Sequence, residues 1–308
     1  MGYIGRVIKI IRLKNKMSRN ELSKGICSEK YIYLIEKNER TPSSEITRLL
    51  GSRLNVDLFK YYEYLDCQSP VKVCYYLKKF KRFRKENNQL ELKKITKKAL
   101  SLQDFKNEPW SYEISLNELT YSVLEENKVK ESIVKIKKII DKMPSAYSND
   151  ICTWNFYLLL SISYQMDDKI KESEKVFAYL NTLIKSKSQV YRYHQVFIST
   201  MINEFFLLLE KKEYLQLINK GNYLYNYQKY MTVYERLHFT YFILAVSYYK
   251  TGQIELGVKW FRKMLYLLLA VDKTKDTLYL RMVPEFNELM ASNIISNDLK
   301  VNFYKKYE

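Results

Sequence analysis

The segment 27–43, CSEKYIYLIEKNERTPS, places charged and aromatic side chains at helical spacing beside the apolar pair Ile32 and Ile35. Because these two residues are three apart, they share one face of an α-helix, and we expect that face to be buried. The other side chains then form an outward edge that offers hydrogen-bond donors and acceptors and an apolar tip. This edge consists of Glu29, Lys30, Tyr33 and Leu34.

Such an edge suits the chemistry of a DNA major groove. A lysine at position 30 can donate to guanine O6 and N7 or to a phosphate, and Leu34 can contact a thymine methyl group. Tyr33 can meet a base edge or the DNA backbone, although the same edge could instead pack on a second domain. Contacts to phosphates, which fix register without reading sequence, are expected from Lys37, Asn38 and Arg40.

Four short helices are predicted in the first 55 residues, and they must position this edge. Ser18 followed by Glu21 has the pattern of a capping box, which begins the second helix. Gly25 ends that helix because glycine adopts the left-handed conformation of a tight turn readily, and Ser28 caps the third helix. The apolar positions are Ile4, Val7, Ile8, Ile11 and Leu13 in the first helix and Ile46, Leu49, Leu50 and Leu54 in the fourth. Ile32 and Ile35 are expected to pack on Leu22, Ile26 and Leu49.

A helix, a tight turn and a second helix form the helix-turn-helix arrangement. Residues 4–58 resemble the five-helix DNA-binding domain of phage-repressor and Cro type, on the motifs Arg-x-x-Lys, Ser-x-x-Glu-Leu, Ile-x-x-Ile-Glu and a proline before the fourth helix. The resemblance implies an ion pair between Arg12 and Glu36. It also places Arg19 where the family often has a base-contacting glutamine, so arginine there would favour guanine or hold a phosphate. The DNA-binding residues expected are Ser18, Arg19, Ser28, Glu29, Lys30, Tyr33, Leu34, Lys37, Asn38 and Arg40.

The composition of the 308 residues predicts an almost entirely helical protein with two domains. Only 7 Gly and 5 Pro interrupt a chain that is 47% hydrophobic, so it lacks the turn residues that β-rich folds need. No uninterrupted apolar stretch has the length of a signal peptide or a membrane span. The four cysteines are scattered without a C-x-x-C pair, which is typical of buried thiols in a cytoplasmic protein.

The net charge of +18 is concentrated near the amino terminus. Residues 1–65 hold 13 Lys and Arg against 7 Asp and Glu, and residues 66–100 hold 11 against 3. The remaining 208 residues share a net charge of only +4. A basic end of this kind indicates a polyanionic partner, although solvated lysines of a biased composition would give the same count. The runs KKFKRFRK at 78–85 and KKITKK at 93–98 are either a solvent-exposed face or a second phosphate-binding surface.

A repeating pattern of paired helices follows residue 66. Segment 241–265 resembles a tetratricopeptide repeat, with Tyr248 as an anchor, Gly252 in the turn, Gly257 at the helix crossing and Phe261 behind it. Four less regular segments share its spacing, so about five hairpins should stack into a right-handed superhelix with a concave side. The anchors are Phe83, Val123, Tyr164, Leu208 and Tyr248, at steps of 40, 41, 44 and 40 residues.

A superhelix of hairpins generally binds peptides or protein segments in its groove. Asparagine side chains can hold the amide groups of an extended peptide because they both donate and accept, and large apolar residues supply pockets. Most of the 29 Tyr and 14 Phe must nevertheless be core or inter-repeat packing. The peptide-binding residues expected from the geometry of the repeat are Asn117, Tyr121, Asn155, Gln165, Asn203, Phe242 and Tyr249.

Nothing in the sequence favours catalysis, a metal or a cofactor. The two histidines, His194 and His238, have no metal-ligand partners nearby in the sequence. No P-loop, G-x-S-x-G or H-E-x-x-H motif occurs. We therefore expect a binding protein and not an enzyme.

The whole chain is similar in domain order to the Rgg/PlcR-type, or RRNPP, receptors for quorum-sensing peptides. The domains expected are a helix-turn-helix domain at 1–65 and a repeat domain at 66–308. The resemblance implies a cytoplasmic transcriptional regulator that forms a homodimer through its repeats and binds double-stranded DNA. A short signalling peptide in the groove would then change DNA affinity. The alternative is a scaffold whose repeats hold a partner protein and whose first domain does not read DNA sequence.

Overall fold

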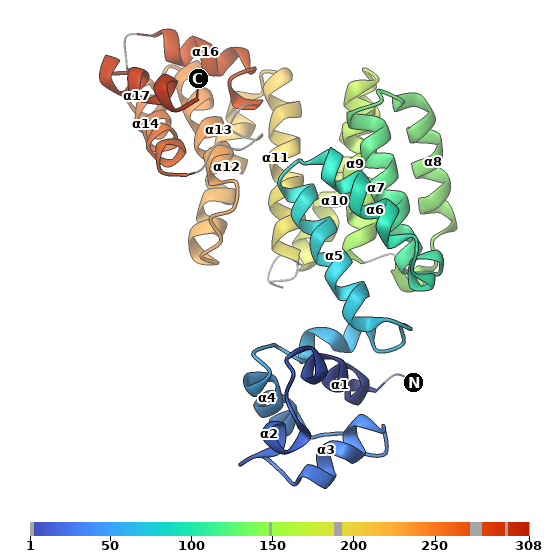
Figure 1. The fold of residues 1–308 in the computed structure, drawn as a ribbon. Coiled ribbons are helices and arrows are strands. Elements are labelled where there is room, and N and C mark those ends of the chain that lie inside the picture. The colour runs from blue at the N-terminus through green and yellow to red at the C-terminus, as the bar shows by residue number, and fades with distance from the viewer. Residues whose placement is uncertain (1–2, 148–149, 188–192, 272–278, 293–294, 308) are drawn as a thin grey trace. The chain divides into compact units, whose positions relative to one another are not determined.

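The computed structural model describes residues 3–147, 150–187, 193–271, 279–292 and 295–307 (Figure 1). Every element of regular structure in these ranges is a helix, as predicted. The chain divides into two compact units. Unit 1 comprises Met1–Lys85 and Leu90–Glu118, and unit 2 comprises Glu86–Gln89 and Leu119–Glu308. The domain boundary expected after residue 65 therefore falls within unit 1.

Unit 1 begins with the four predicted short helices. They are α1 (Ile4–Lys14), α2 (Arg19–Ser23), α3 (Glu29–Glu36) and α4 (Ser44–Arg53), and the fifth helix is a 3-10 helix at Phe59–Tyr64. We call residues 4–64 the helix-turn-helix module. Its core includes Ile4, Val7, Ile8, Ile11, Leu22, Ile32, Ile35, Leu50, Leu54 and Leu58.

Serine side chains begin these helices as the sequence predicts. In α2, Ser18 Oγ accepts from the Glu21 backbone N–H at 3.1 Å, and Glu21 Oε2 accepts from the Ser18 N–H at 2.6 Å. This capping box satisfies two amides that the first helical turn leaves without partners. Ser28 caps α3 by accepting from the Tyr31 N–H, and Gly25 has the left-handed φ of +72° expected in the tight turn.

Two core predictions for the module are wrong. Leu13 is 56% exposed, because two residues after Ile11 it lies about 200° around α1, on the side away from the buried stripe. Leu49 is half-buried and lies outside the core cluster of the module, whereas Leu50 is fully buried in it. Gly5 explains the close approach of α1 to α3, since a Cβ atom at Gly5 would lie 1.8 Å from the carbonyl oxygen of Ile35.

The rest of unit 1 is built around the hairpin of α5 (Pro70–Lys85) and α6 (Gln89–Ala99). Asp104 caps the start of α5, since its carboxylate accepts from the backbone N–H groups of Gln68 at 2.6 Å and Ser69 at 3.0 Å. A negative charge is favourable at a helix amino terminus. The core of this hairpin is Cys67, Val73, Phe80, Phe83, Leu92, Ala99, Phe105 and Ile114.

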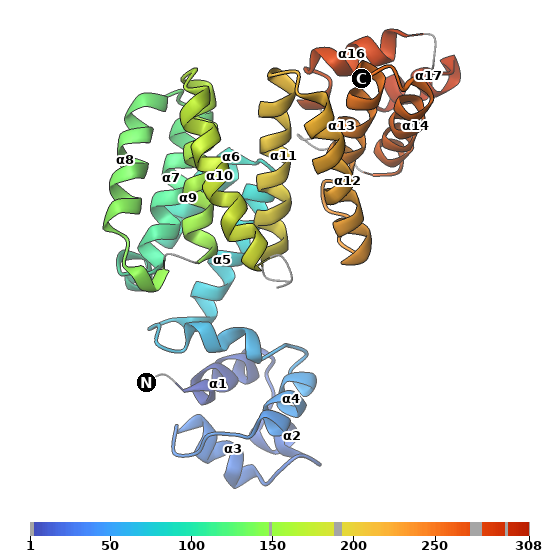
Figure 2. The same ribbon diagram turned by 180° about the vertical axis from the view of Figure 1, so that it is seen from behind.

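Four more pairs of consecutive helices follow in the chain. The last pair packs with two carboxy-terminal helices, and these lie beside α13 and α14 in Figures 1 and 2. None of the helices in the described ranges is long and apolar enough to cross a membrane. The bounds are α7 Trp110–Leu124, α8 Val129–Lys142, α9 Ile151–Met166, α10 Ile170–Lys187, α11 His194–Glu210, α12 Tyr214–Tyr230, α13 Leu237–Lys250, α14 Ile254–Ala270, α16 Pro284–Ala291 and α17 Asn297–Tyr307.

Each of the five hairpins turns on one residue with left-handed backbone. These residues are Asn87, Asn127, Asp168, Lys212 and Gly252, with φ between 49° and 81°. They follow one another at the same steps as the predicted anchors, so the repeat found in the sequence is a repeat of turn geometry. Asparagine, aspartate and glycine tolerate this conformation best, which is why four of the five turns use them.

The anchors precede these turns and accept their hydrogen bonds. The backbone N–H groups of residues 169, 213 and 253 donate to the carbonyl groups of Tyr164, Leu208 and Tyr248, each at 2.9 Å. In each case an N–H group donates to the carbonyl oxygen five residues before it, which is the 6→1 hydrogen bond of a Schellman motif. The residues five and nine positions after each turn residue are buried, and in unit 2 they are Ser132 and Ile136, Ser173 and Phe177, Leu217 and Gly221, and Gly257 and Phe261.

The end of the chain is fixed against α14. The Tyr307 hydroxyl donates to the Leu268 carbonyl oxygen at 2.7 Å, and Lys306 Nζ donates to the Leu269 carbonyl oxygen at 2.7 Å. These carbonyl groups lie in the last turn of α14, where the helix has no N–H partners of its own. The helix α17 therefore closes the core of unit 2.

Candidate DNA-binding and peptide-binding sites

The outward edge of α3 is accessible, as the spacing predicts. Ile32 and Ile35 are fully buried, whereas Glu29, Lys30 and Tyr33 are exposed. Leu34 is half-buried. Both capping serines next to this edge, Ser18 and Ser28, use their hydroxyl oxygens as acceptors for helix amides.

The ion pair expected between α1 and α3 is confirmed. Arg12 Nε donates to Glu36 Oε1 at 2.6 Å, and Arg12 Nη2 donates to Oε2 at 3.0 Å. The two side chains are only 7% and 1% exposed. Arg12 Nη1 also donates to the Met17 carbonyl oxygen, so the fork of the guanidinium joins α1, α3 and the turn before α2.

A second arginine shares the same carboxylate, which the sequence reasoning missed. Arg19 Nε donates to Glu36 Oε2 at 2.8 Å, and the Arg19 guanidinium lies 5.3 Å from the centre of the Tyr33 ring. Lys37 Nζ lies 5.8 Å from that ring centre. Among the described residues, Glu36 alone accepts a hydrogen bond from Arg19. The N–H groups on the two terminal nitrogens of Arg19 are therefore available to donate hydrogen bonds to another molecule.

Burial and hydrogen bonding act in opposite directions on Glu36. Burial disfavours the charged carboxylate, but the hydrogen bonds and positive charges of Arg12 and Arg19 outweigh it. The net effect is that the pKa of Glu36 lies below its ordinary value of 4.5. The carboxylate is therefore ionised and fixes the orientation of Arg19 beside Tyr33.

The remaining predicted DNA-binding residues lie at the carboxy-terminal end of α3. Lys37 is the C-cap of the helix, and Asn38 follows with a left-handed φ of +63°. Both residues are exposed, as is Arg40. The left-handed turn directs the chain away from α3 here, so positively charged and amide side chains gather at one end of the outward edge.

Two of the seven predicted peptide-binding residues are core residues in this structure. Asn117 is 2% exposed, and its amide donates to Thr96 Oγ1 at 3.0 Å within unit 1. Phe242 is fully buried in unit 2, where its ring packs against Phe286. Repeat geometry placed these residues on an inner face, but α16 covers α13 and leaves Phe242 no exposed surface.

The other five predicted residues are half-buried, and all lie in unit 2. The amide groups of Asn155 and Asn203 donate to carbonyl oxygens of their own helices at 2.9 and 2.8 Å, and Gln165 Nε2 lies 3.3 Å from Ser173 Oγ. Each amide thus retains hydrogen-bonding capacity. Tyr121 and Tyr249 complete this set.

The helix α11 carries a row of accessible residues that the sequence reasoning identified only in part. The row contains Gln195, Ser199, Asn203 and Phe206, all half-buried and spaced by three or four residues. That spacing defines one face of a helix. On the neighbouring face, Glu204 accepts from Asn181 at 3.0 Å and from Lys220 at 2.8 Å, which joins α10, α11 and α12.

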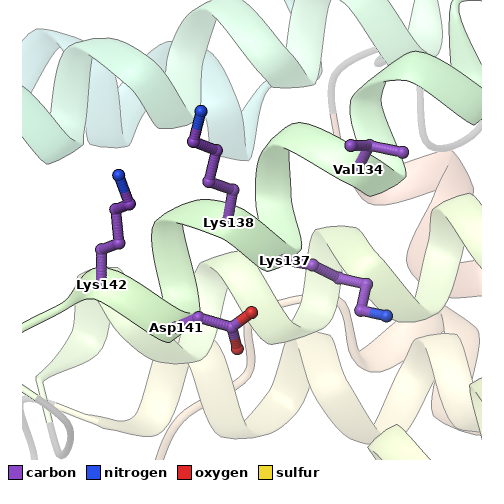
Figure 3. Close-up of a pocket in the computed structure, with 5 residues that line it drawn as sticks. All are labelled: Val134, Lys137, Lys138, Asp141 and Lys142. Atoms are coloured by element: carbon purple, nitrogen blue, oxygen red, sulfur yellow. The ribbon is translucent and has the colours of Figure 1, made fainter.

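A surface hollow of about 350 Å³ lies on α8 and contains none of the predicted residues. Figure 3 shows its lysine side chains extending away from the helix ribbon. Val134, which is 67% exposed, is its apolar side chain. The lining residues are Val134, Lys137, Lys138, Asp141 and Lys142. All five come from one helix, so the hollow has no opposing wall and offers a ligand little burial.

The described residues include no group of three or more His, Cys, Asp or Glu side chains that could hold a metal ion. His238 packs against the ring of Phe239, and burial together with the positive charge of Arg236 lowers its pKa to about 4. A half-buried, packed histidine whose pKa is lowered in this way is neutral at pH 7.

The fold is therefore that of an all-α protein with a helix-turn-helix module followed by tetratricopeptide-like hairpins. No protein-family model matches the sequence, and no curated protein matches it. The crystal structure of Bacillus thuringiensis PlcR in complex with the peptide PapR7 and DNA is similar, with a TM-score of 0.64 at 15% sequence identity over 87% of this chain and 96% of that chain. This similarity establishes the fold.

Two further structures superpose less closely. ComR from S. thermophilus, in complex with DNA and its signalling peptide ComS, has a TM-score of 0.47 at 13% identity over 99% of this chain and 100% of that chain. The Streptococcus dysgalactiae SHP pheromone receptor Rgg2 has a TM-score of 0.42 at 15% identity over 93% and 99% of the two chains.

Proposed function

We propose that this protein is a DNA-binding transcriptional regulator whose repeats bind a short signalling peptide. The observation that carries the proposal is the accessible edge of α3, held in place by the buried pair of Arg12 and Glu36. The fold shared with PlcR, which was solved with both a peptide and DNA, supports it. No catalytic role is part of this proposal.

In this proposal, α3 enters the major groove of double-stranded DNA. Lys30 donates to guanine or a phosphate, Tyr33 meets a base edge or the backbone, and Leu34 contacts a thymine methyl. Glu36 holds Arg19 through its Nε, so the terminal nitrogens of Arg19 remain free to donate to guanine or a phosphate. The residues that contact phosphate are Lys37, Asn38 and Arg40, and Ser18, Ser28 and Glu29 lie beside the contacts.

The basic surface of unit 1 is proposed to add phosphate contacts. On α5 and α6, the side chains of Lys78, Lys81, Lys97 and Lys98 are exposed. Each phosphate neutralised by such a lysine releases counterions, so DNA affinity falls steeply with salt.

The peptide is proposed to bind in unit 2. Asn155 and Asn203 lie half-buried on α9 and α11, the first helices of successive hairpins, and can bond to peptide amide groups without regard to side chains. Gln165, Tyr121 and Tyr249 extend the same set. In this scheme the protein acts in the cytoplasm as a homodimer joined through the repeats, and peptide binding changes its affinity for a two-fold DNA site.

A pair of variants tests the DNA-binding part of the proposal. After selection of bound duplexes from a random pool, fluorescence anisotropy gives the affinity for the selected duplex and for a scrambled one. Lys30→Ala should reduce the preference for the selected duplex by about 1–3 kcal/mol, whereas Lys37→Ala should weaken both duplexes equally. Equal losses for both variants on both duplexes would point to the alternative of a scaffold.

The peptide-binding part requires a separate measurement. A library of short peptides is screened against the full chain by thermal shift, and the best binder is titrated by calorimetry. Asn203→Ala should weaken binding by about 1 kcal/mol or more, while Asn226→Ala, on the exposed surface of α12, should not. If a saturating concentration of the peptide left the affinity for the selected DNA duplex unchanged, the proposed coupling between peptide binding and DNA binding would be refuted.

A further inference from the structure

Three aromatic side chains from three helices of unit 2 surround one ammonium group. Lys263 Nζ lies 4.4 Å from the ring centre of Trp260, 5.8 Å from that of Tyr225 and 6.0 Å from that of Tyr241. Tyr225 belongs to α12, Tyr241 to α13, and both Trp260 and Lys263 to α14. We call the three rings the aromatic cage.

The rings of the cage also contact one another. Tyr225 meets Trp260 edge-on with ring centres 4.9 Å apart, and Tyr241 lies 5.5 Å from Trp260 and 6.1 Å from Tyr225. Burial raises the pKa of the Tyr241 phenol, and the neighbouring phenols of Tyr225 and Tyr234 raise it further. All three ring centres thus lie within 6.0 Å of Lys263 Nζ, so the cage forms one site that favours positive charge.

The cage is half-buried and remains open at its edge. All three aromatic side chains are of intermediate exposure, and so is Lys263. Lys263 makes no hydrogen bond or ion pair with any of the described residues. The ammonium is therefore held by the rings alone, on a flexible stem of four carbons that can swing into solvent.

Aromatic rings arranged around one point bind cations because their faces carry negative potential. Because Lys263 has no carboxylate partner among the described residues, its contacts with the three rings are what stabilises its ammonium group in this position. We infer that the aromatic cage is a binding site for an ammonium or guanidinium group of a peptide ligand, and that Lys263 occupies it as an internal competitor. An incoming cation replaces Lys263, whose tether gives it a high effective concentration. This inference rests on the peptide-binding part of the proposed function and does not depend on DNA binding.

The test uses small cations and the fluorescence of Trp260. Butylammonium, ethylguanidinium and glycinamide represent a lysine side chain, an arginine side chain and an amino-terminal ammonium, and 1-butanol and ethylurea are neutral controls. At constant ionic strength, the cations should quench Trp260 in Lys263→Ala with an affinity about tenfold higher than in the unchanged protein. The cation that binds best identifies the source of the charge.

Matched variants assign the signal and its cause. Trp260→Phe separates it from the other two tryptophans, Tyr225→Leu should abolish the gain, and Lys259→Ala, which removes an exposed lysine of the same helix, should give none. Lys263→Met keeps the apolar stem and serves if the alanine variant fails to fold. Equal quenching by the neutral analogues, no gain in either Lys263 variant, or unfolding of both would overturn the inference.

Discussion

At the scale of single residues, Glu36 organises the helix-turn-helix module. It accepts hydrogen bonds from Arg12 on α1 and Arg19 on α2 while its own side chain is almost fully buried. One carboxylate therefore fixes three helices and the guanidinium next to Tyr33. A buried charge that loses its partner is costly, so this network should dominate the stability of the module.

The first prediction concerns Glu36→Gln. Since folding lowers the pKa of Glu36, its ionised form contributes stability that is present above the unfolded pKa of 4.5 and lost as the pH falls below it. The variant should lower module stability at neutral pH by about 3 kcal/mol and show a shallower loss in acid. Hydrogen exchange of α1 and α3 amides, corrected for the intrinsic effect of pH, measures both.

Glu39→Gln is the matched control, because Glu39 is exposed and its substitution removes the same charge. It should change neither the neutral stability nor the acid dependence by more than about 0.5 kcal/mol. If both variants behaved alike, the buried network would not be the source of the pH dependence.

The second prediction compares two glycines of the module. Gly5→Ala should destabilise it by about 3 kcal/mol or more, because the new Cβ atom would meet the Ile35 backbone oxygen, which cannot rotate away. Gly25→Ala should cost only about 1–2 kcal/mol, since nothing lies within 4 Å and only the left-handed φ is unfavourable. The same exchange measurement ranks them, and the reverse order would contradict the packing of α1 on α3.

Residue-level prediction succeeded where a motif defined both partners. The pair of Arg12 and Glu36 followed from a family resemblance, and the caps at Ser18 and Ser28 followed from local spacing. The bond from Arg19 to Glu36 did not, because an arginine at a helix start gives no sign of which carboxylate lies across the turn. The aromatic cage likewise needs three helices to be placed before its rings meet.

At the scale of helices, the turn residues explain the repeat. The left-handed residues recur at the steps read from the anchors, and each is followed by buried residues five and nine positions later. The sequence could predict the hairpins for this reason, even where the tetratricopeptide pattern is weak. It could not predict that Phe242 is covered, because that depends on α16, which lies outside the repeat.

The third prediction concerns the helix crossings of unit 2. Gly257→Ala should destabilise the unit by about 2–3 kcal/mol, because the new Cβ atom would lie 2.9 Å from the backbone nitrogen of Tyr249. Gly221→Ala should cost less, about 1 kcal/mol, since its nearest neighbour is the movable Leu244 side chain. Thermal unfolding followed by circular dichroism tests this order, and a larger loss at Gly221 would refute it.

At the scale of the molecule, the two units differ in charge, and the partners that we propose for them differ accordingly. Most of the net charge lies in the first 100 residues, where the accessible edge of α3 is found. The amide and aromatic residues suited to a peptide lie in unit 2. The charge distribution predicts a polyanionic partner for the basic end, and the repeats predict a peptide partner. Identifying individual groove residues requires knowing which helices cover which faces.

The fourth prediction concerns salt. The variant changes Lys78, Lys81, Lys97 and Lys98 together to alanine. The slope of log affinity against log salt is negative, and it should become less steep by about 1 for each phosphate that these lysines no longer neutralise. Anisotropy titrations at several salt concentrations give the slope. An unchanged slope would mean that the basic surface of α5 and α6 only faces solvent.

The most direct measurement of the central claim is the specificity ratio of the unchanged protein. Its affinity for a duplex selected from a random pool is compared with its affinity for a scrambled duplex of equal length at one fixed salt concentration. If the outward edge of α3 reads bases, the ratio should be about 10³ or greater. A ratio near one would mean that the helix-turn-helix module does not recognise DNA sequence.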